Sequence, residues 1–273
     1  MYDFYFGTKE EILANERDYL LFIKRMLPRW VNGIPDSEFL AIHDILNQPD
    51  GKSHQRVLVE TGSGASSLVM LYHAIKNNGT LYTWDTNANK GSFLREVASD
   101  TICRTFNTCV HDHWKFVAYS STDRHLGINI LREFNDRVDF CFLDSLHTLD
   151  NLLEELSLVL ECFNAEGYIA IDDANYTNKS TNIPFINIVR KKLGLPAVPD
   201  LPNNVCRAYH IEVNEYLTNR CQSVERVNDT YKRTCTDDLS FAYYALDKQV
   251  TSKIGMEKLD DIKHRFDAWK ITK

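Results

Sequence analysis

The sequence lacks several features that would place it in a membrane or outside the cell. No apolar run approaches the length needed to span a bilayer, and the opening MYDFYFGTKEE has no basic stretch followed by an apolar one. There is no CxxC pair: the seven cysteines are odd in number, scattered, and in several cases set in apolar runs. We therefore expect a reducing, cytoplasmic setting, no zinc site and no membrane partner.

An excess of positive charge is also missing. The 31 Lys and Arg residues stand against 38 Asp and Glu, which gives a net charge of −7, whereas a nucleic-acid partner requires a basic surface. Internal repeats and low-complexity segments are absent. The 273 residues, 44% hydrophobic and 25% charged, predict an ordinary globular protein with one large core, or one core and a small cap.

What the sequence does contain is an alternation of short apolar runs with amphipathic stretches. Apolar runs typical of strands stand at 57–59, 80–85, 115–121, 138–144 and 167–173, and helical patterns fall between them at 68–78, 90–100, 123–134 and 151–163. This order predicts βαβ units. We expect an α/β fold: a Rossmann-like, doubly wound, mostly parallel sheet with helices on both faces.

The flanking regions predict additions to that core. Residues 1–54 form an expected N-terminal helical extension, and the core is expected to run over 55–250 with an insertion at 177–240. A late strand, SFAYYAL, is expected to run antiparallel near the end of the core. Residues 251–273 read as an amphipathic C-terminal helix, and the amphipathic helices at both ends suggest a homodimer.

The first expected strand ends at Glu60 and is followed by a glycine-rich turn, ETGSGASS. Gly62 and Gly64 permit a tight turn and close approach of a ligand to the backbone. The turn is neither a GxGxxG motif nor a phosphate-binding loop, which would need Gly-Lys-Ser/Thr. A carboxylate at this place suits a ligand with an ammonium group or ribose hydroxyls; the plainer interpretation is a βα turn that binds nothing.

The ends of the second and third strands carry further polar residues. Asp85 is placed to accept hydrogen bonds from both hydroxyls of a ribose, although it could instead cap the turn that follows. Ser120 and Ser121 could border the edge of an adenine ring. Because the carboxyl ends of parallel strands share one edge of the sheet, we expect these residues near Glu60.

Acidic residues end the fourth and fifth strands. Asp144 ends one, and Asp172 and Asp173 end the other. Three carboxylates gathered at one edge repel one another, and a hard divalent cation such as Mg²⁺ removes that conflict. Helix capping would explain one of these residues but not the set. His147 could be a base, a metal neighbour, a substrate contact, or simply the first residue of a helix.

These residues in this order resemble a known family. The segment ETGSG, then Asp85, then LDSLH at 143–147, then GYIAIDD at 167–173, is similar to the class I S-adenosylmethionine-dependent methyltransferases. The stretch 143–175 resembles most the metal-dependent small-molecule O-methyltransferases, of the catechol type and of bacterial sugar modification. The resemblance covers about residues 55–176.

The resemblance implies roles for individual residues. It places the methionine part of the cofactor against one set of turn residues, namely Glu60, Gly62, Gly64 and Ser66. It gives Asp85 the ribose, Ser120 and Ser121 the adenine, and Asp144, Asp172 and Asp173 a divalent metal such as Mg²⁺. The catechol type has Asn where Asp173 stands. The implied mechanism has the metal lower the pKa of an acceptor hydroxyl while Asp144 or His147 takes its proton.

Two other functions stay open. An NAD-dependent sugar oxidoreductase or epimerase would need a third glycine in the 60–67 turn, which is not present. A non-catalytic binding protein with a degenerate methyltransferase core is disfavoured by intact carboxylates at several strand ends. We expect a small-molecule hydroxyl acceptor, with its specificity set by the N-terminal helices and the 177–240 region.

Overall fold

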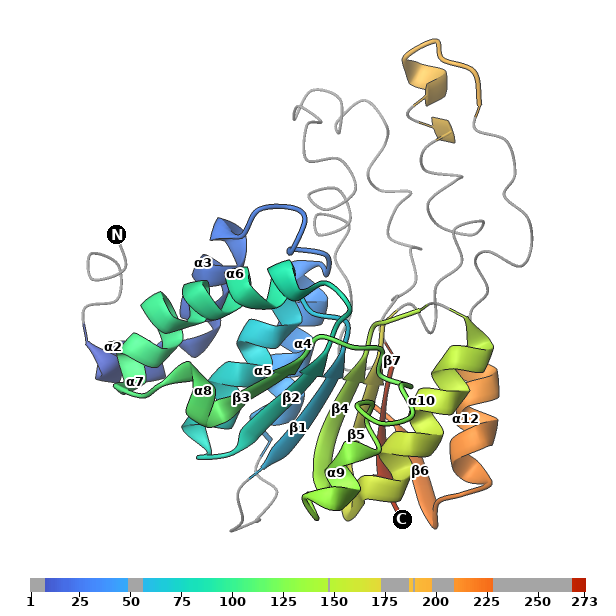
Figure 1. The fold of residues 1–273 in the computed structure, drawn as a ribbon. Helices are drawn as coiled ribbons and strands as arrows, with labels where there is room; N and C mark the ends of the chain where they lie inside the picture. The colour runs from blue at the N-terminus through green and yellow to red at the C-terminus, as the bar shows by residue number, and fades with distance from the viewer. Residues whose placement is uncertain are drawn as a thin grey trace.

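A computed structural model describes residues 8–48, 56–146, 148–172, 187–188, 190–197, 209–227 and 267–273. The described residues include a seven-stranded sheet with the strand order β3-β2-β1-β4-β5-β7-β6 (Figure 1). The strands are β1 (Val57–Thr61), β2 (Thr80–Trp84), β3 (Trp114–Val117), β4 (Val138–Leu143), β5 (Phe163–Ile171), β6 (Ser223–Arg226) and β7 (Asp267–Thr272). The first five run parallel, and β7 runs antiparallel between β5 and β6. The expected Rossmann-like sheet with an antiparallel late strand is confirmed.

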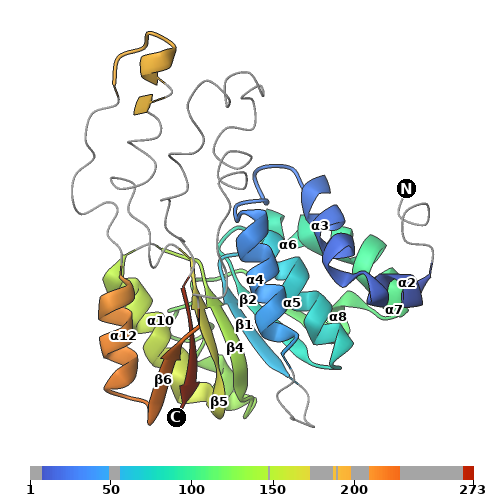
Figure 2. The ribbon, with the colours of Figure 1, turned by 180° about the vertical axis from the view of Figure 1, so that it is seen from behind.

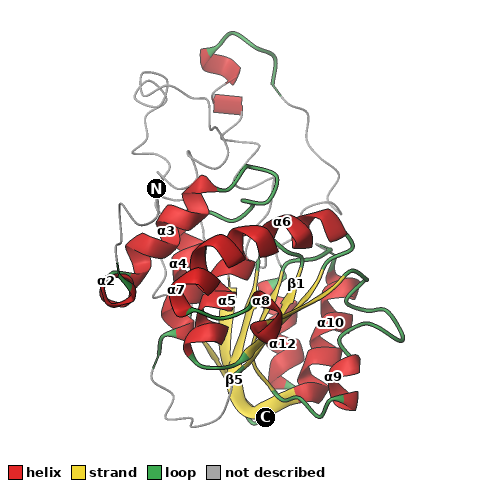
Figure 3. Cartoon of the chain, turned by 60° about the vertical axis from the view of Figure 1, so that its left-hand side comes forward, coloured by secondary structure: helices red, strands yellow, loops and turns green. Residues whose placement is uncertain are grey.

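Helices cover both faces of this sheet (Figures 1 and 3). On one side are α2 (Lys9–Ala14), α3 (Glu16–Met26), α4 (Asp36–Leu46), α5 (Ala65–Lys76), α6 (Ala88–Ala98), the π-helix η1 (Ser99–Cys103), α7 (Arg104–Phe106) and α8 (Val110–His113). On the other are α9 (Ile130–Glu133), α10 (Leu149–Cys162) and α12 (His210–Thr218).

The two hydrophobic cores follow from the two-residue period of the strands. In β1, Leu58 packs with α2–α8, whereas its neighbour Val59 packs with α9, α10 and α12. In β4, Phe140 and Cys141 divide between the two faces in the same way. Both faces are buried, which explains why the parallel strands read as continuous apolar runs rather than as alternating ones.

The N-terminal helices belong to the first of these cores. Tyr19 and Ile23 of α3 and Phe39 of α4 are fully buried in the same cluster as the residues of α5. Helices α3, α4 and α5 lie together on one face of the sheet (Figure 2). Between α4 and α5 lies a buried histidine pair, with His43 Nδ1 3.0 Å from His73 Nε2. Burial lowers the pKa of His73 well below its ordinary value. The described part of the N-terminal extension is therefore integral to the core.

One expectation about the C-terminal part is wrong: residues 267–272 form the strand β7 and not the end of a helix. Residues 210–226, which lie within the expected insertion, supply α12 and the edge strand β6. Trp269 and Ile271 fill the core beneath α10 and α12. Two open strand edges, those of β5 and β6, pair with this segment, and such non-local pairing overrides a local helical period. The expected strand SFAYYAL lies outside the described residues.

The expected helix at 123–134 is also shorter than its pattern suggests. Only Ile130–Glu133 is helical, because the Asp123 carboxylate accepts hydrogen bonds from the backbone N–H groups of His125 and Leu126, both at 2.8 Å. This local turn competes with helix formation. In the described part of the chain, no helix is both long enough and apolar enough to cross a bilayer.

Candidate cofactor and catalytic site

The candidate site lies at the carboxyl ends of the parallel strands, the upper edge of the sheet in Figure 1. One residue beyond each strand, the parallel hydrogen-bond ladder continues. Asp85 N donates to Val117 O at 3.2 Å, Gly62 N to Trp84 O at 2.8 Å, Asp144 N to Thr61 O at 2.9 Å, and Asp172 N to Leu143 O at 3.1 Å. The edge therefore presents Asp85, Gly62, Asp144 and Asp172 in that order, on four neighbouring strands. Adjacent strands lie about 4.8 Å apart, so the two aspartates of β4 and β5 are neighbours.

The turn after β1 needs glycine at its first position. Gly62 has φ of 76°, and a Cβ atom there would lie 1.9 Å from the carbonyl oxygen of Asp144. Two turns thus meet backbone to backbone at the centre of the edge. At Gly64, just before α5, a Cβ atom would lie 3.1 Å from Val31 O, so the loop between α3 and α4 reaches the same turn.

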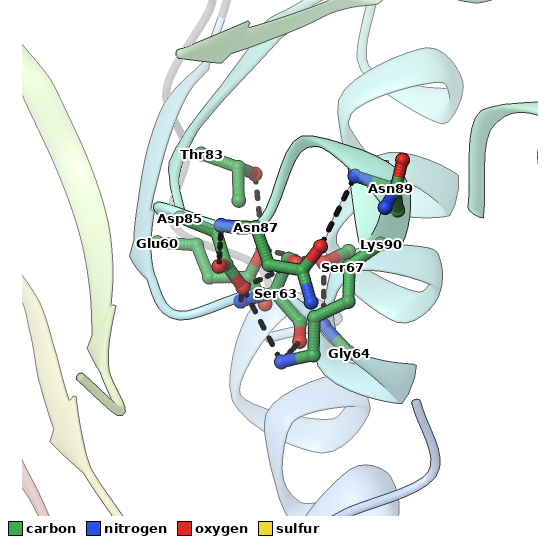
Figure 4. A network of polar contacts seen from close by, with 9 residues as sticks. All are labelled: Glu60, Ser63, Gly64, Ser67, Thr83, Asp85, Asn87, Asn89 and Lys90. Carbon is green, nitrogen blue, oxygen red and sulfur yellow. Dashed lines mark hydrogen bonds and ion pairs between the residues drawn. The ribbon is translucent and has the colours of Figure 1, made fainter. Parts of the chain in front are cut away.

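Glu60 lies beneath this turn and not at its rim. Its side chain is fully buried, and Oε2 accepts hydrogen bonds from Ser67 Oγ at 2.6 Å and Thr83 Oγ1 at 2.9 Å (Figure 4). Burial raises the pKa of Glu60 to about 7, against the opposing effect of hydrogen bonds from Ser66, Ser67 and Thr83. Ser66 is likewise buried and interacts with this carboxylate. The methionine-binding roles predicted for both residues stay predictions.

Asp85 is engaged by four donors of the chain itself (Figure 4). Oδ2 accepts from Ser63 N at 2.8 Å, Ser63 Oγ at 2.6 Å and Lys90 Nζ at 3.3 Å, and Oδ1 accepts from Asn87 N at 2.7 Å. Burial alone would raise the pKa of Asp85, but the hydrogen bonds from Ser63 and Asn87 and the charge of Lys90 outweigh it and lower the pKa. The residue is ionised and joins the glycine turn to the start of α6.

The chemical groups at this edge of the sheet fit a cofactor that carries a ribose and a positive charge. A carboxylate offers about four acceptor positions, so ribose hydroxyls that donate to Asp85 replace donors already present. The side-chain donors Ser63 Oγ and Lys90 Nζ can rotate away, whereas the backbone N–H groups of Ser63 and Asn87 are fixed by the turns. Asp85 can therefore hold a diol, but only in exchange for its two side-chain partners, Ser63 Oγ and Lys90 Nζ.

The two serines expected near adenine differ in what they contact. Ser120 is exposed, and its hydroxyl lies 3.2 Å from Thr122 Oγ1. Ser121 is buried and donates a short hydrogen bond to the carboxylate of Glu155, on the α10 side of the sheet. The adenine role stays a prediction for both, although the Ser121 hydroxyl has a structural partner.

The metal positions are described in part. Asp144 is half-buried at the end of β4 and Asp172 is buried at the end of β5, whereas Asp173 and His147 lie outside the described residues. Among the residues that the structure describes, no group of three His, Cys, Asp or Glu side chains is placed to hold a metal ion. Mg²⁺ often takes only one or two carboxylates and fills its other positions with water or substrate oxygens, so the pair Asp144 and Asp172 fits it as a partial ligand set.

Glu155 of α10 is the residue that the sequence reading missed. It is 1% exposed and accepts hydrogen bonds from the hydroxyls of Thr61 at 3.3 Å, Ser145 at 2.6 Å, and Ser121. Burial raises its pKa, although these hydrogen bonds oppose the shift. One signal was available: Glu155 stands beside Leu156 on the apolar stripe of an amphipathic helix, where a carboxylate needs partners.

Comparison with known proteins agrees with this geometry. Residues 59–174 match a family model described as a methyltransferase domain, which spans β1 to the end of β5. No curated protein sequence matches the chain.

A solved structure shares the fold at low sequence identity. The chain is similar to an O-methyltransferase from Bacillus cereus in complex with SAH, at a TM-score of 0.52 and 10% identity, with 100% of both chains covered. It is also similar to TomG, an O-methyltransferase from Streptomyces achromogenes involved in tomaymycin synthesis, in complex with SAM. That match has a TM-score of 0.49 and 10% identity and covers 88% of this chain and 81% of TomG. Residues 59–174 thus match a methyltransferase domain, and the chain shares its Rossmann-like fold with the O-methyltransferase from Bacillus cereus.

Proposed function

We propose that this chain is an S-adenosylmethionine-dependent O-methyltransferase that methylates a hydroxyl of a small molecule, such as a sugar or a secondary metabolite. The single observation that carries the proposal is the row of Asp85, Gly62, Asp144 and Asp172 on four neighbouring strand ends. One half of this row, around Asp85, suits a ribose and a cationic donor. The other half, Asp144 with Asp172, suits an acceptor held by a divalent cation such as Mg²⁺.

The proposed division of roles follows the strand order. Asp85 receives the ribose hydroxyls, and the turn at Gly62 and Gly64 lets the methionine part approach the backbone. Asp144, on the next strand but one, faces the acceptor, with Asp172 beside it. Asp173 stays the predicted third metal ligand. The donor and the acceptor are thus side by side, and holding two reactants in attack geometry supplies much of the rate of such a transfer.

When bound, the cofactor supplies an electrophilic methyl group on a sulfonium, and a divalent cation supplies positive charge that lowers the pKa of the hydroxyl beside it. Asp144 accepts the proton of that hydroxyl, with His147 as the alternative base. With the cofactor bound, the acceptor oxygen would take the methyl group and the sulfur would keep the electron pair of the broken carbon–sulfur bond, so the transfer would need no nucleophilic side chain of the protein.

Calorimetry with S-adenosylmethionine and with NAD tests the cofactor. We expect binding of S-adenosylmethionine and none of NAD, since the 60–67 turn lacks the third glycine of a dinucleotide fingerprint. Binding of NAD alone would favour the oxidoreductase. Binding of neither would overturn the proposed function.

Release of S-adenosylhomocysteine over a panel of sugars and hydroxylated metabolites tests the reaction. We expect turnover with at least one hydroxyl acceptor in Mg²⁺ and its loss in EDTA. Turnover unaffected by EDTA would support the methyltransferase activity and contradict the proposed metal requirement. Cofactor binding without turnover on any acceptor, with or without Mg²⁺, would favour a binding protein with a degenerate core.

A further inference from the structure

The buried carboxylate of Glu155 contacts the backs of both turns that meet at the centre of the edge. Oε2 accepts from Thr61 Oγ1, on the residue just before Gly62, and Oε1 accepts from Ser145 Oγ, on the residue just after Asp144. These two turns lie so close that a Cβ atom at Gly62 would sit 1.9 Å from Asp144 O. A single side chain of α10 therefore joins the end of β1 to the end of β4.

The connection extends on both sides. Asn151 Nδ2 donates to Ser145 Oγ at 3.0 Å, so the Ser145 hydroxyl both accepts and donates. Thr61 Oγ1 accepts from Asp144 N at 3.3 Å, besides the bond of the same N–H to Thr61 O. The backbone of Asp144 is thereby held from two directions, through Thr61 and through Ser145, and both routes end at Glu155.

We propose that Glu155 is a positioning residue, which fixes the backbone of Asp144 so that its carboxylate stays aimed at the acceptor and the divalent cation. The proposal rests on the proposed function of Asp144. Glu155 itself is buried, with 1% of its surface exposed, among three hydroxyl donors. Two of them, Thr61 and Ser145, connect it to Asp144. A buried carboxylate serves this purpose better than an amide, because both of its oxygens accept and all three hydroxyls can donate.

The matched control is Asp139, another buried carboxylate, at the opposite end of the sheet. Asp139 Oδ2 accepts from Val57 N at 3.0 Å and Oδ1 from Asn164 Nδ2 at 2.8 Å, near the start of β1 and β5. Asp139→Asn changes a carboxylate to an amide of equal size, as Glu155→Gln does, but far from Asp144. A general loss of stability affects both variants, whereas loss of positioning affects only Glu155→Gln.

The first test is hydrogen–deuterium exchange of the protein without ligand. In Glu155→Gln we expect the amides of residues 62–64 and 144–146 to exchange faster by on the order of tenfold, with the β1 and β4 interiors unchanged. Ser145→Ala should reproduce the effect at 144–146. Asp139→Asn should leave both turns at the wild-type rate. Equal acceleration throughout the sheet in Glu155→Gln, or none at the two turns, would overturn the proposal.

The second test uses Mn²⁺ as a spectroscopic probe, with free Mn²⁺ measured by electron paramagnetic resonance in the presence of S-adenosylhomocysteine. We expect Glu155→Gln to weaken Mn²⁺ binding by about 10–100-fold, the usual effect of removing a group that orients a ligand. The affinity for S-adenosylhomocysteine should change by less than about threefold. Unchanged Mn²⁺ affinity in a variant that keeps its fold would overturn the positioning role. Failure of the wild-type protein to bind Mn²⁺ would instead contradict the metal in the proposed function. The hydrogen–deuterium exchange experiment would then decide whether Glu155 positions the backbone of Asp144.

Discussion

The two halves of the strand-end edge are supported in different ways. At β1 and β2, Asp85 accepts hydrogen bonds from Ser63 and Lys90 at the surface of the site, and the buried Glu60 lies beneath the glycine turn without contacting Asp85 by a hydrogen bond. At β4 and β5, Asp144 and Asp172 place two carboxylates on adjacent strands, and the backbone of Asp144 is supported by a buried residue, Glu155, through Ser145 and Thr61. The first half must exchange partners when a ligand binds. The second half keeps its geometry, which is the arrangement expected where chemistry needs fixed groups.

The largest effect that separates the halves is expected from Asp144→Asn. Under the proposed function, loss of the carboxylate removes a proton acceptor and a metal ligand, so turnover should fall by about 10²–10⁴-fold. We call the β1 and β2 half, around Asp85, the donor half, and the β4 and β5 half the acceptor half. The affinity for S-adenosylmethionine should stay within about threefold of wild type, because the donor half is untouched. Release of S-adenosylhomocysteine measures the turnover, and calorimetry measures the affinity for S-adenosylmethionine.

One result of the Asp144→Asn experiment would contradict the role proposed for Asp144. Weakened cofactor binding with unchanged turnover at saturation would move Asp144 to the donor half. The comparison between the halves would then fail, since one residue would serve both.

Glu60→Gln probes the buried side of the donor half through stability. The folded-state pKa of Glu60 is about 7 against an ordinary 4.5, so the folded protein binds more protons than the unfolded chain between these values. The free energy of unfolding therefore falls as pH rises through this window, by up to about 3 kcal/mol. Glutamine does not titrate and removes this fall. Urea unfolding at pH 5 and pH 8 measures the free energy of unfolding of both proteins. The free energy of the variant relative to that of wild type should be higher at pH 8 than at pH 5.

Parallel stability profiles for the two proteins would show that Glu60 is ionised in the folded state across this range. Its hydroxyl partners, Ser67 and Thr83, would then outweigh its burial. The donor half would in that case carry a fixed negative charge beneath the glycine turn.

Asp85→Ala is expected to act on the cofactor alone. A hydrogen bond to a charged group contributes about 1.5–3 kcal/mol, so the dissociation constant for S-adenosylmethionine should rise by about 10–150-fold. Turnover at saturating cofactor should fall much less than in Asp144→Asn. Calorimetry measures the constant. An unchanged value would exclude the ribose role and leave Asp85 as a residue that orders the glycine turn through Ser63.

The sequence predicted most of the sheet because its signals are local. Each parallel strand is buried on both faces and reads as an apolar run, and each ends in a turn or a polar residue such as Asp85. The strand β7 escaped prediction because its partners β5 and β6 are distant in the chain. Glu155 escaped for the same reason: its hydrogen bond to Thr61 joins residues 94 positions apart. The placement of Asp85 among four donors was equally invisible, since Ser63 and Lys90 reach it only after folding.

The smallest effect, and the finest test of the comparison, is expected from Lys90→Met. Lys90 Nζ donates to Ser63 O at 2.8 Å and to Asp85 Oδ2 at 3.3 Å, so it occupies an acceptor position that a ribose hydroxyl needs. Its side chain is 27% exposed, and a partly exposed ion pair contributes about 0.2–1 kcal/mol. Removing this competitor should tighten S-adenosylmethionine binding by about 1.4–5-fold, and the gain should shrink at high salt because salt already weakens the pair in wild type.

Lys76→Met is the matched control, because Lys76 also pairs with a carboxylate, Glu16 at 2.7 Å, but at the opposite end of α5 from the glycine turn. It should leave cofactor affinity unchanged at every salt concentration. Weaker binding in Lys90→Met alone would mean that the ammonium group holds the turn in its binding shape instead of competing with the ligand. The donor half would then be fixed by its own contacts in the way that Glu155 is proposed to fix the acceptor half, and the contrast between the two halves would be one of position and not of mechanism.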